Sequence, residues 1–382
     1  MLNPHLTDAL LDARRRTDEL FSLLAPGAMY DRPIPERHRI IFYLGHLEAF
    51  DWNQIARVPS AQPEFDKLFE FGIDPPPGRL PEDQPSDWPS VEETRQYGHR
   101  ARAAIDRLVA QGAVSDQLLH VAIEHRQMHA ETLAYMLHNL PPDRKIAPAA
   151  AQVQMSEEPV SPSMIEVPAG EATLGRKRNN GFGWDNEFDQ HTVELPAFAM
   201  GKYKVTNGEY LEFVRAGAKP PHFWIERDNQ WFQRTMFGEV PLQLNWPVYT
   251  TQHEAAAFAK WSGKALPSEP QFHRAAQGSQ PENCDFRAWD PIPVTSSPQN
   301  PSRFSQLIGN GWEWTSTVFQ PFPGFEPFPF YPGYSANFFD GEHYVLKGAS
   351  ARTAACFLRS SFRNWFRPDY PYVYAGFRCV EN

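Results

Sequence analysis

The feature that most constrains the fold is a change of pattern near residue 145. Before it, four segments repeat apolar residues at intervals of three and four, the period of one face of an α-helix; they span residues 7–24, 34–56, 90–112 and 115–140. Beyond it, short alternating segments and loops rich in Pro, Gly and aromatic residues replace that period. Since four amphipathic helices form a bundle, we expect a four-helix bundle followed by an irregular α+β domain.

Composition predicts where the two domains meet. Residues 145–163 are rich in Ala, Pro and Ser and form the expected linker between a helical domain over residues 1–144 and an α+β domain over residues 164–382. A chain of 382 residues is long enough to bury two hydrophobic cores. Individual helix starts carry the capping-box pattern, namely Ser90 with Glu93, Thr206 with Glu209 and Thr251 with Glu254.

Charge and composition argue against several classes of function. With a net charge of −10, the chain is a poor partner for nucleic acid or an anionic membrane. No apolar run reaches the roughly 18 residues of a membrane span, and the first residues lack the apolar core of an export signal, so we expect a cytoplasmic protein. The three cysteines are scattered, which argues against a disulfide framework or a Cys-rich zinc site.

The fourth helical segment contains a candidate metal site. His125 and His129 are four residues apart, so on a helix their imidazoles share one face and can converge on one ion. The metalloprotease pattern H-E-x-x-H is excluded, because Arg126 follows the first His. His46, in a partly buried stretch of the second helix, is the expected third ligand, since bundles build metal sites from facing helices. The alternative is that His46 is a hydrogen-bonded core residue and the pair faces solvent.

Several motifs of the second domain resemble a known family. PAGEATLG, FAMGKYKVTNGEYLEFV, LPSEPQFHRAA, GNGWEWTS and YAGFRCV are similar to the successive signatures of formylglycine-generating, or sulfatase-modifying-factor, enzymes. The N-terminal helices with their three His resemble a DinB-type bundle. Together they resemble the ergothioneine-type sulfoxide synthases, the EgtB-like family, and GFGWDNEFDQHTVEL and FRNW strengthen the likeness. The resemblance implies a DinB-like four-helix bundle followed by a formylglycine-generating-enzyme-like, C-type-lectin-like α+β domain.

The resemblance also implies an enzyme with a metal cofactor. In this family a mononuclear non-haem Fe(II), here expected on His46, His125 and His129, uses O₂ to join sulfur to C2 of the imidazole of hercynine, which is Nα-trimethylhistidine. FYPGYS resembles the tyrosine motif of the family, which implies that Tyr331 is the catalytic proton donor and that Tyr334 contacts the substrate. Without that motif, the simpler interpretation is that both tyrosines are packing aromatics.

The FRNW motif implies further substrate contacts. Asn364 and Trp365 match positions that contact hercynine in relatives. The trimethylammonium group of hercynine also suits an aromatic wall, which Trp365 or Tyr334 would provide. Two positions depart from the family pattern: Met128 stands where relatives have a Gln that binds hercynine, and Phe366 stands where synthases of the mycobacterial type have Asp.

A third departure concerns the chalcogen donor. Relatives that use γ-glutamylcysteine or cysteine carry an Arg-rich segment for the donor's carboxylates, whereas residues 69–89 offer Arg79 among acidic residues and prolines. Such a loop suits a polyhydroxylated donor, and the selenoneine synthases of this superfamily fit that description. The resemblance then implies C–Se bond formation between hercynine and a selenosugar, 1-seleno-β-D-glucose. The alternative is ordinary sulfoxide synthesis with cysteine or γ-glutamylcysteine as thiol donor.

A function of another class is also open at this point. DinB-type bundles can carry zinc and act as thiol-dependent transferases, and a sulfatase-factor-like domain can serve as a non-catalytic binding module. Formylglycine generation itself is disfavoured, because it requires a reactive pair of cysteines and Cys356 has no second cysteine within a few residues.

Overall fold

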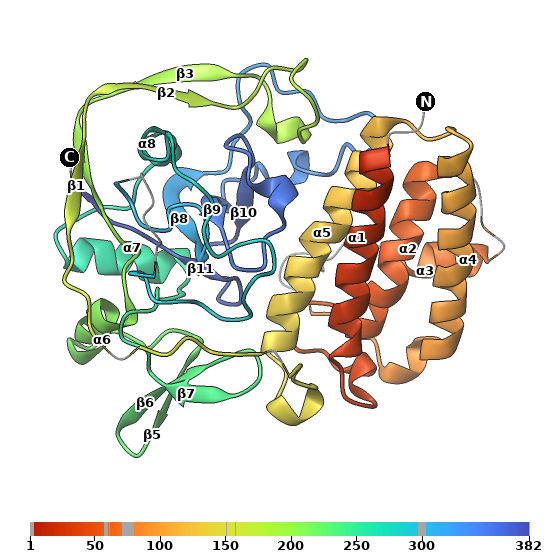
Figure 1. The fold of residues 1–382 in the computed structure, drawn as a ribbon, viewed down its shortest axis with the longest axis horizontal. Helices are drawn as coiled ribbons and strands as arrows, with labels where there is room; N and C mark the ends of the chain where they lie inside the picture. Colours follow the sequence, from red (N-terminus) through yellow and green to blue (C-terminus); the bar gives the residue numbers. More distant parts are fainter. Residues whose placement is uncertain are drawn as a thin grey trace. The chain divides into compact units, whose positions relative to one another are not determined.

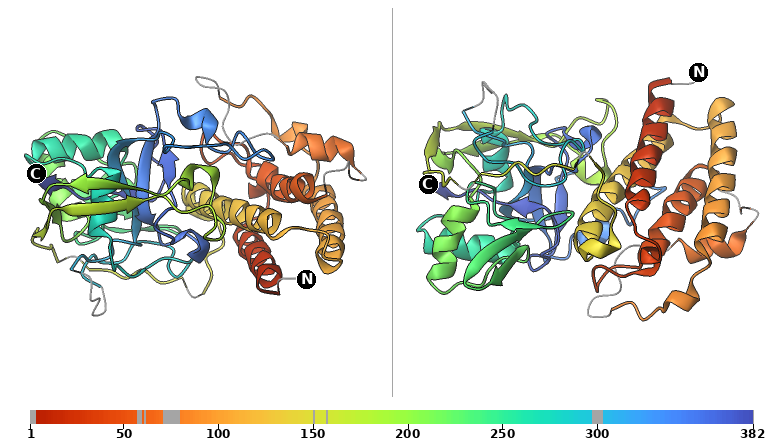
Figure 2. Two further views of the ribbon diagram at one scale, coloured as in Figure 1. Left: turned by 90° about the horizontal axis from the view of Figure 1, so that it is seen from above. Right: turned by 60° about the horizontal axis from the view of Figure 1, so that its bottom comes forward.

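The computed structural model describes residues 4–56, 60, 62–70, 80–149, 151–156, 158–296 and 303–381. These residues form two compact units, Met1–Ala149 and Ala150–Asn382, which Figures 1 and 2 draw as ribbons. The first unit is helical, and the second combines helices with small β-sheets. The fold class is therefore the one that the sequence predicts, a helical bundle followed by an α+β domain. None of the described helices has both the length and the apolarity that a membrane crossing requires.

Four long helices form the bundle of the first unit (Figure 1): α1 Pro4–Ser22, α2 Ile40–Ile55, α4 Val91–Ala110 and α5 Asp116–His138. Helix α5 packs against both α1 and α2, and α2 also packs against α4. Because α5 has neighbours on two sides, most of its residues are buried, including several that carry charge or an imidazole. A short helix, α3 Pro63–Leu68, lies in the long connection between α2 and α4.

The helix boundaries follow local capping chemistry. At the start of α4, the Ser90 hydroxyl accepts from the Glu93 backbone N–H at 3.2 Å, and the Glu93 carboxylate accepts from the Ser90 N–H at 2.9 Å, so the predicted capping box is present. Helix α2 begins at Ile40, later than the predicted residue 34, because Arg39 has extended backbone angles and residues 34–37 form a turn.

The central sheet of the second unit has the strand order β10-β9-β8-β11. Strand β9 runs antiparallel to β8, and β11 runs parallel to β8. The four strands are β8 Gly311–Val318, β9 Tyr344–Ala349, β10 Asn364–Phe366 and β11 Ala375–Gly376. Shorter strands form three further sheets, with members β1 Met164–Val167, β2 Gly170–Leu174, β3 His191–Leu195, β4 Phe198–Gly201, β5 Trp224–Arg227, β6 Gln230–Arg234, β7 Glu239–Pro241 and β12 Val380–Glu381.

The second unit also has three helices: α6 Asn207–Arg215, which packs against α7, α7 Gln252–Trp261 and α8 Glu269–Ala275. Helices α7 and α8 both contact β8. The sequence predicted α6 and α7 from their capping boxes but not α8, although Ser268 and Gln271 form a capping box of the same kind at its start. The signal was present, but α8 is too short for a recognisable apolar period.

Candidate metal centre

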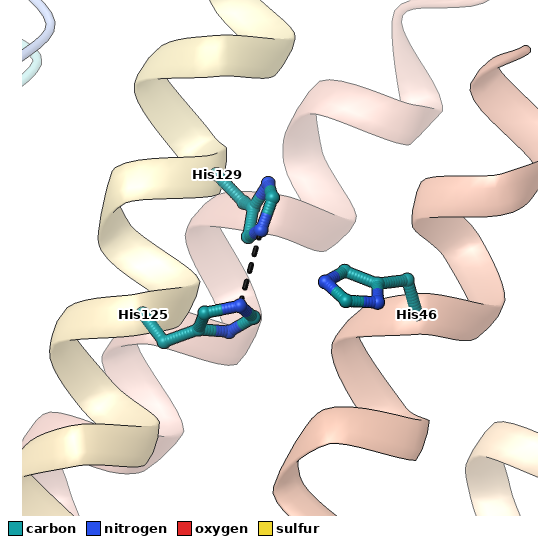
Figure 3. A group of neighbouring side chains, drawn as sticks. All are labelled: His46, His125 and His129. Atoms are coloured by element: carbon teal, nitrogen blue, oxygen red, sulfur yellow. Dashed lines mark hydrogen bonds between the residues drawn. The ribbon is translucent and has the colours of Figure 1, made fainter. Parts of the chain in front are cut away.

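Helices α2 and α5 bring three imidazoles together in the interior of the bundle. Figure 3 shows His46 on α2 pointing toward His125 and His129, which lie one turn apart on α5. The Nε2 atoms of His125 and His129 are 3.1 Å apart, and the three potential ligand atoms all lie within 4.8 Å of one another. Three nitrogens this close can reach one metal ion with small adjustments, since metal–nitrogen bonds are about 2.0–2.1 Å long.

A backbone carbonyl orients His46. Its Nδ1–H donates to the carbonyl oxygen of Phe69 at 2.7 Å, which leaves the Nε2 lone pair for a metal. Phe69 can approach helix α2 because the residue before His46 is Gly45, where a Cβ would lie 2.5 Å from the Phe69 ring. Aromatic packing fixes the rings further, with Phe42 stacked on His46 at 4.8 Å and Phe50 stacked on His125 at 3.4 Å between centroids. Sequence reasoning did not assign Phe69 a role, because the contact joins residues far apart in the chain.

The electrostatics of the site favour neutral imidazoles. All three side chains are buried, and burial lowers the pKa of His46 to about 4 and holds the pKa values of His125 and His129 well below the usual range. The imidazoles therefore keep free lone pairs at neutral pH. Among the described residues, the Nδ1 atoms of His125 and His129 have no hydrogen-bond partner. Three neutral nitrogen donors without a carboxylate among them suit a first-row divalent metal and leave coordination positions open for other ligands.

A buried ion-pair network joins the two ligand-bearing helices beside the imidazoles. Arg126, which follows His125 on α5, donates from Nη1 to Glu48 Oε1 at 3.0 Å and from Nη2 to Asp51 Oδ2 at 2.6 Å. Nη2 also donates to the Leu47 carbonyl at 3.0 Å. Although burial opposes it, the charge of Arg126 helps to lower the pKa of Glu48 to about 2. The residue that excluded the metalloprotease motif thus links α5 to α2.

The two predicted tyrosines lie in the second unit, on the connection between β8 and β9. The buried ring of Tyr334 stacks on Trp184 with centroids 3.9 Å apart and meets Trp365 edge-on at 5.4 Å. Tyr331 is half-buried, and its ring centroid lies 5.8 Å from that of Tyr334. Burial, and then the negative charge of Asp185, raise the pKa of Tyr331 to about 12. Its phenol therefore holds a proton at neutral pH.

A short turn that carried no predicted role anchors the tyrosine segment. This 3-10 turn, η4 Asp185–Glu187, follows Trp184. The Ser335 hydroxyl donates to Asp185 Oδ1 at 2.5 Å, and the same carboxylate accepts a backbone hydrogen bond from Phe328. Asp185 thus bonds to both ends of residues 328–335. The motif GFGWDNEFDQHTVEL strengthens the family likeness, but one sequence cannot show what its carboxylates contact.

The other predicted substrate contacts are distributed over both units. Asn364, Trp365 and Phe366 form β10, where Asn364 Oδ1 accepts from the Trp365 backbone N–H at 2.9 Å and Phe366 stacks on Tyr370 at 5.3 Å. Met128 is half-buried on α5 in the first unit, directly before the second His of the pair. The structure therefore brings Tyr334 and Trp365 together, and it places Met128 beside the metal ligands along the helix.

The charge of the long connection between α2 and α4 requires a correction. Asp74 and Arg79 lie outside the described residues. Within the described part of this connection, Asp83 forms ion pairs with Arg32 and Arg39, two residues that precede α2. Tertiary contacts therefore supply two guanidinium groups to this loop in addition to Arg79, which residues 69–89 alone do not reveal.

Comparison with known proteins identifies two domain families in the chain. Residues 149–382 match the sulfatase-modifying factor enzyme 1-like domain. Residues 9–138 match the DinB superfamily. The two matches together cover most of both compact units.

Sequence comparison also finds several named relatives. The hercynine oxygenase of Mycobacterium tuberculosis is 31% identical over 76% of this chain and 78% of that protein. The hercynine oxygenase of Mycolicibacterium thermoresistibile is 29% identical over 99% of this chain and 95% of that protein. Ergothioneine biosynthesis protein 1 of Neurospora crassa is 28% identical over 94% of this chain. The chain spans about half the length of the fungal relatives that it matches, 56% and 54%.

Proposed function

Because this chain belongs to the EgtB-like sulfoxide synthase family, which combines a DinB domain with a sulfatase-modifying-factor-like domain, we propose that it is a non-haem Fe(II)- and O₂-dependent enzyme. The proposed reaction forms a carbon–chalcogen bond at C2 of the imidazole of hercynine. The observation that carries the proposal is the convergence of three buried, neutral imidazoles, His46, His125 and His129, in the bundle. Hercynine as substrate is supported by the names of the bacterial relatives.

The residues of the first unit would hold the metal. His46, His125 and His129 supply three nitrogen ligands, and the Phe69 carbonyl sets the orientation of the first of them. The chemistry that Fe(II) supplies at such a site is electron transfer to O₂, with open coordination positions for the substrates. The aromatic rings packed on His46 and His125 keep water away from the ligand side chains.

The residues of the second unit would bind hercynine and supply a proton. Tyr331 is the proposed proton donor: its pKa of about 12 keeps the phenolic proton in place until a strongly basic group appears. Tyr334 and Trp365 offer an aromatic surface of the kind that binds a trimethylammonium group. Asn364, Phe366 and Met128 are the other proposed contacts of the substrate.

For the donor we propose a selenosugar, 1-seleno-β-D-glucose, so that the product is the C–Se compound of selenoneine biosynthesis. One support is the pair of sequence departures at Met128 and Phe366. A second is that the described part of the connection before α4 offers no unpaired arginine cluster, because Arg32 and Arg39 form ion pairs with Asp83. Sulfoxide synthesis with cysteine or γ-glutamylcysteine is the second candidate, and the names of the fungal and bacterial relatives favour it.

A donor competition tests the proposal. Purified protein loaded with Fe(II) is given hercynine, O₂ and equal concentrations of selenoglucose, cysteine and γ-glutamylcysteine, and the products are separated by mass. We expect kcat/KM with selenoglucose to exceed that with either thiol at least tenfold, which corresponds to about 1.4 kcal/mol. A mainly cysteine-derived sulfoxide would establish the second candidate instead. Bound zinc with no O₂ consumption with any donor would favour the transferase or binding-module function.

A further inference from the structure

We propose that Asp83 is an internal carboxylate that occupies the guanidinium groups of Arg32 and Arg39 in the helical unit and thereby excludes donors that carry carboxylates. This makes Asp83 a specificity-determining residue. The inference deepens the proposed function, on which it rests for the reaction itself, because it assigns the choice of donor class to one side chain.

The contacts of Asp83 resemble those that a bound carboxylate would make. Arg32 donates to Oδ1, and Arg39 donates from Nε to Oδ2 at 3.0 Å. The Trp88 indole N–H donates to Oδ2 at 2.8 Å, so both carboxylate oxygens have a cationic partner and one has a third donor. Further bonds from the same arginines hold the loop backbone, with Arg39 Nη2 donating to the Asp83 carbonyl at 2.9 Å and Arg32 Nη1 donating to the Pro81 carbonyl at 2.9 Å.

A path of packed aromatic rings connects this arginine pair to the metal ligands within the same unit. The Trp88 ring packs against Phe42 at 6.0 Å and against Phe69 at 6.1 Å between centroids. Phe42 is the ring that stacks on His46, and Phe69 provides the carbonyl that orients it. Two aromatic side chains in series, Trp88 and then Phe42 or Phe69, therefore connect the Asp83 carboxylate to the first metal ligand.

The charge balance of the cluster explains how Asp83 would select the donor. Two guanidinium groups at this place could hold the carboxylate of a thiol donor in a bidentate manner. In this chain Asp83 already pairs with both and offsets one of their two charges. Burial of its side chain, which raises the pKa, is outweighed by the Trp88 hydrogen bond and the two arginine charges, which lower it. An anionic donor would have to displace Asp83 and leave it unpaired beside a new negative charge. A sugar donor has no carboxylate and does not compete for the arginines.

The side chains of the cluster remain accessible enough for exchange. Exposure is 17% for Arg32, 14% for Arg39 and 21% for Asp83, so the arginines lie at the edge of the unit rather than in its core. Removing the Asp83 charge would therefore leave the two arginines reachable by a dissolved anion.

The test uses the full chain with Asp83→Asn, which keeps the shape of the side chain and an acceptor for Trp88 but removes the charge. Asp87→Asn is the matched control, because it removes the same charge from the same loop. Asp87 is exposed and accepts the local Gln84 N–H at 2.7 Å, and it forms no ion pair among the described residues. We expect kcat/KM with γ-glutamylcysteine to rise at least tenfold in Asp83→Asn, while kcat/KM with selenoglucose changes less than threefold. Asp87→Asn should change neither value.

A second measurement does not depend on turnover. Glutarate, an unreactive dicarboxylate, should bind to Asp83→Asn at least tenfold more tightly than to the parent by calorimetry, and Asp83→Glu, which restores a carboxylate, should behave like the parent. Equal glutarate affinity in parent and Asp83→Asn, or an unchanged donor preference, would show that Asp83 only anchors the loop. If no donor reacts with hercynine in the parent, the proposed function fails, and the glutarate titration still decides whether Asp83 blocks an anion site.

Discussion

Arg126 donates a 2.6 Å hydrogen bond to Asp51, and neither side chain has exposed surface. The same guanidinium bonds to Glu48 and to the carbonyl of Leu47, so one residue of α5 makes three bonds to α2. Two of the metal ligands sit on α5 and the third on α2. The distance between the two helices at the metal site is therefore fixed by a buried charge network directly beside it.

Replacing Arg126 should destabilise the helical unit strongly. Arg126→Met removes the cation and leaves the buried Asp51 carboxylate without its ion-pair partner, whereas Glu48 keeps its salt bridge to Arg102. Breaking a buried ion pair in this way typically costs about 3–5 kcal/mol. Urea unfolding followed by helical circular dichroism would measure the loss. Arg15→Met is the control, since Arg15 pairs with Asp12 and Glu19 at the surface and its loss should cost less than about 1 kcal/mol. Equal stability of the two variants would contradict the proposal that Arg126 holds α2 and α5 together.

Removing one metal ligand should abolish metal binding without unfolding the chain. In His129→Ala the two remaining imidazoles, His46 and His125, are too few to hold iron in competition with water and buffer. We expect iron content near zero, no product, and a circular dichroism spectrum like that of the parent. His120→Ala, on the same helix but outside the group of three, should retain its iron. Full iron content and activity in His129→Ala would refute the assignment of the ligands.

The phenol of Tyr331 should matter for bond formation more than for binding. General-acid help typically contributes about 10²- to 10⁴-fold, so Tyr331→Phe should lose product formation by a factor in that range while the Kd for hercynine changes little. Single-turnover product analysis and calorimetric titration with hercynine separate the two effects. Tyr334→Phe, which retains the stacked ring, should keep much higher activity. If instead Tyr331→Phe matches the parent and Tyr334→Phe is inactive, the two roles are exchanged.

Acid should destabilise the second unit through His273. Burial, and then the charge of Lys347, lower the pKa of His273 to about 3 in the folded chain, against an ordinary value of about 6.5. The unfolded chain therefore binds more protons below pH 6.5, and the stability from this group is lost as the pH falls from 6.5 toward 3. The slope for one such group is at most about 1.4 kcal/mol per pH unit.

Comparison with a variant isolates this contribution. His273→Asn keeps a donor for the Thr173 carbonyl, which His273 Nδ1 bonds at 3.1 Å, but cannot take up a proton. When the pH is lowered from 6.5 to 5, the urea midpoint of His273→Asn should decrease less than the urea midpoint of the parent. His253→Asn, at an exposed position, should follow the parent. Parallel pH profiles for the parent and His273→Asn would show that His273 does not titrate on unfolding.

The sequence by itself determined the local features of the two units. A repeat of three and four residues fixes one face of a helix, so the four helical segments and the shared face of His125 and His129 follow from spacing alone. Capping boxes are equally local, and the predicted one at Ser90 is present. The family could be recognised from short motifs for the same reason, because each of them lies within one contiguous stretch of chain.

Only the tertiary structure decided which distant residues meet. His46 joins the pair on α5 because α2 packs against α5, and the Phe69 carbonyl reaches it only where Gly45 leaves space. Asp83 meets Arg39 across 44 positions of the chain, so a charge count along the loop could not find that pair. Periodicity reports the face on which a side chain lies, whereas its partner depends on how whole helices and loops pack, and that packing is set by the summed burial of many residues.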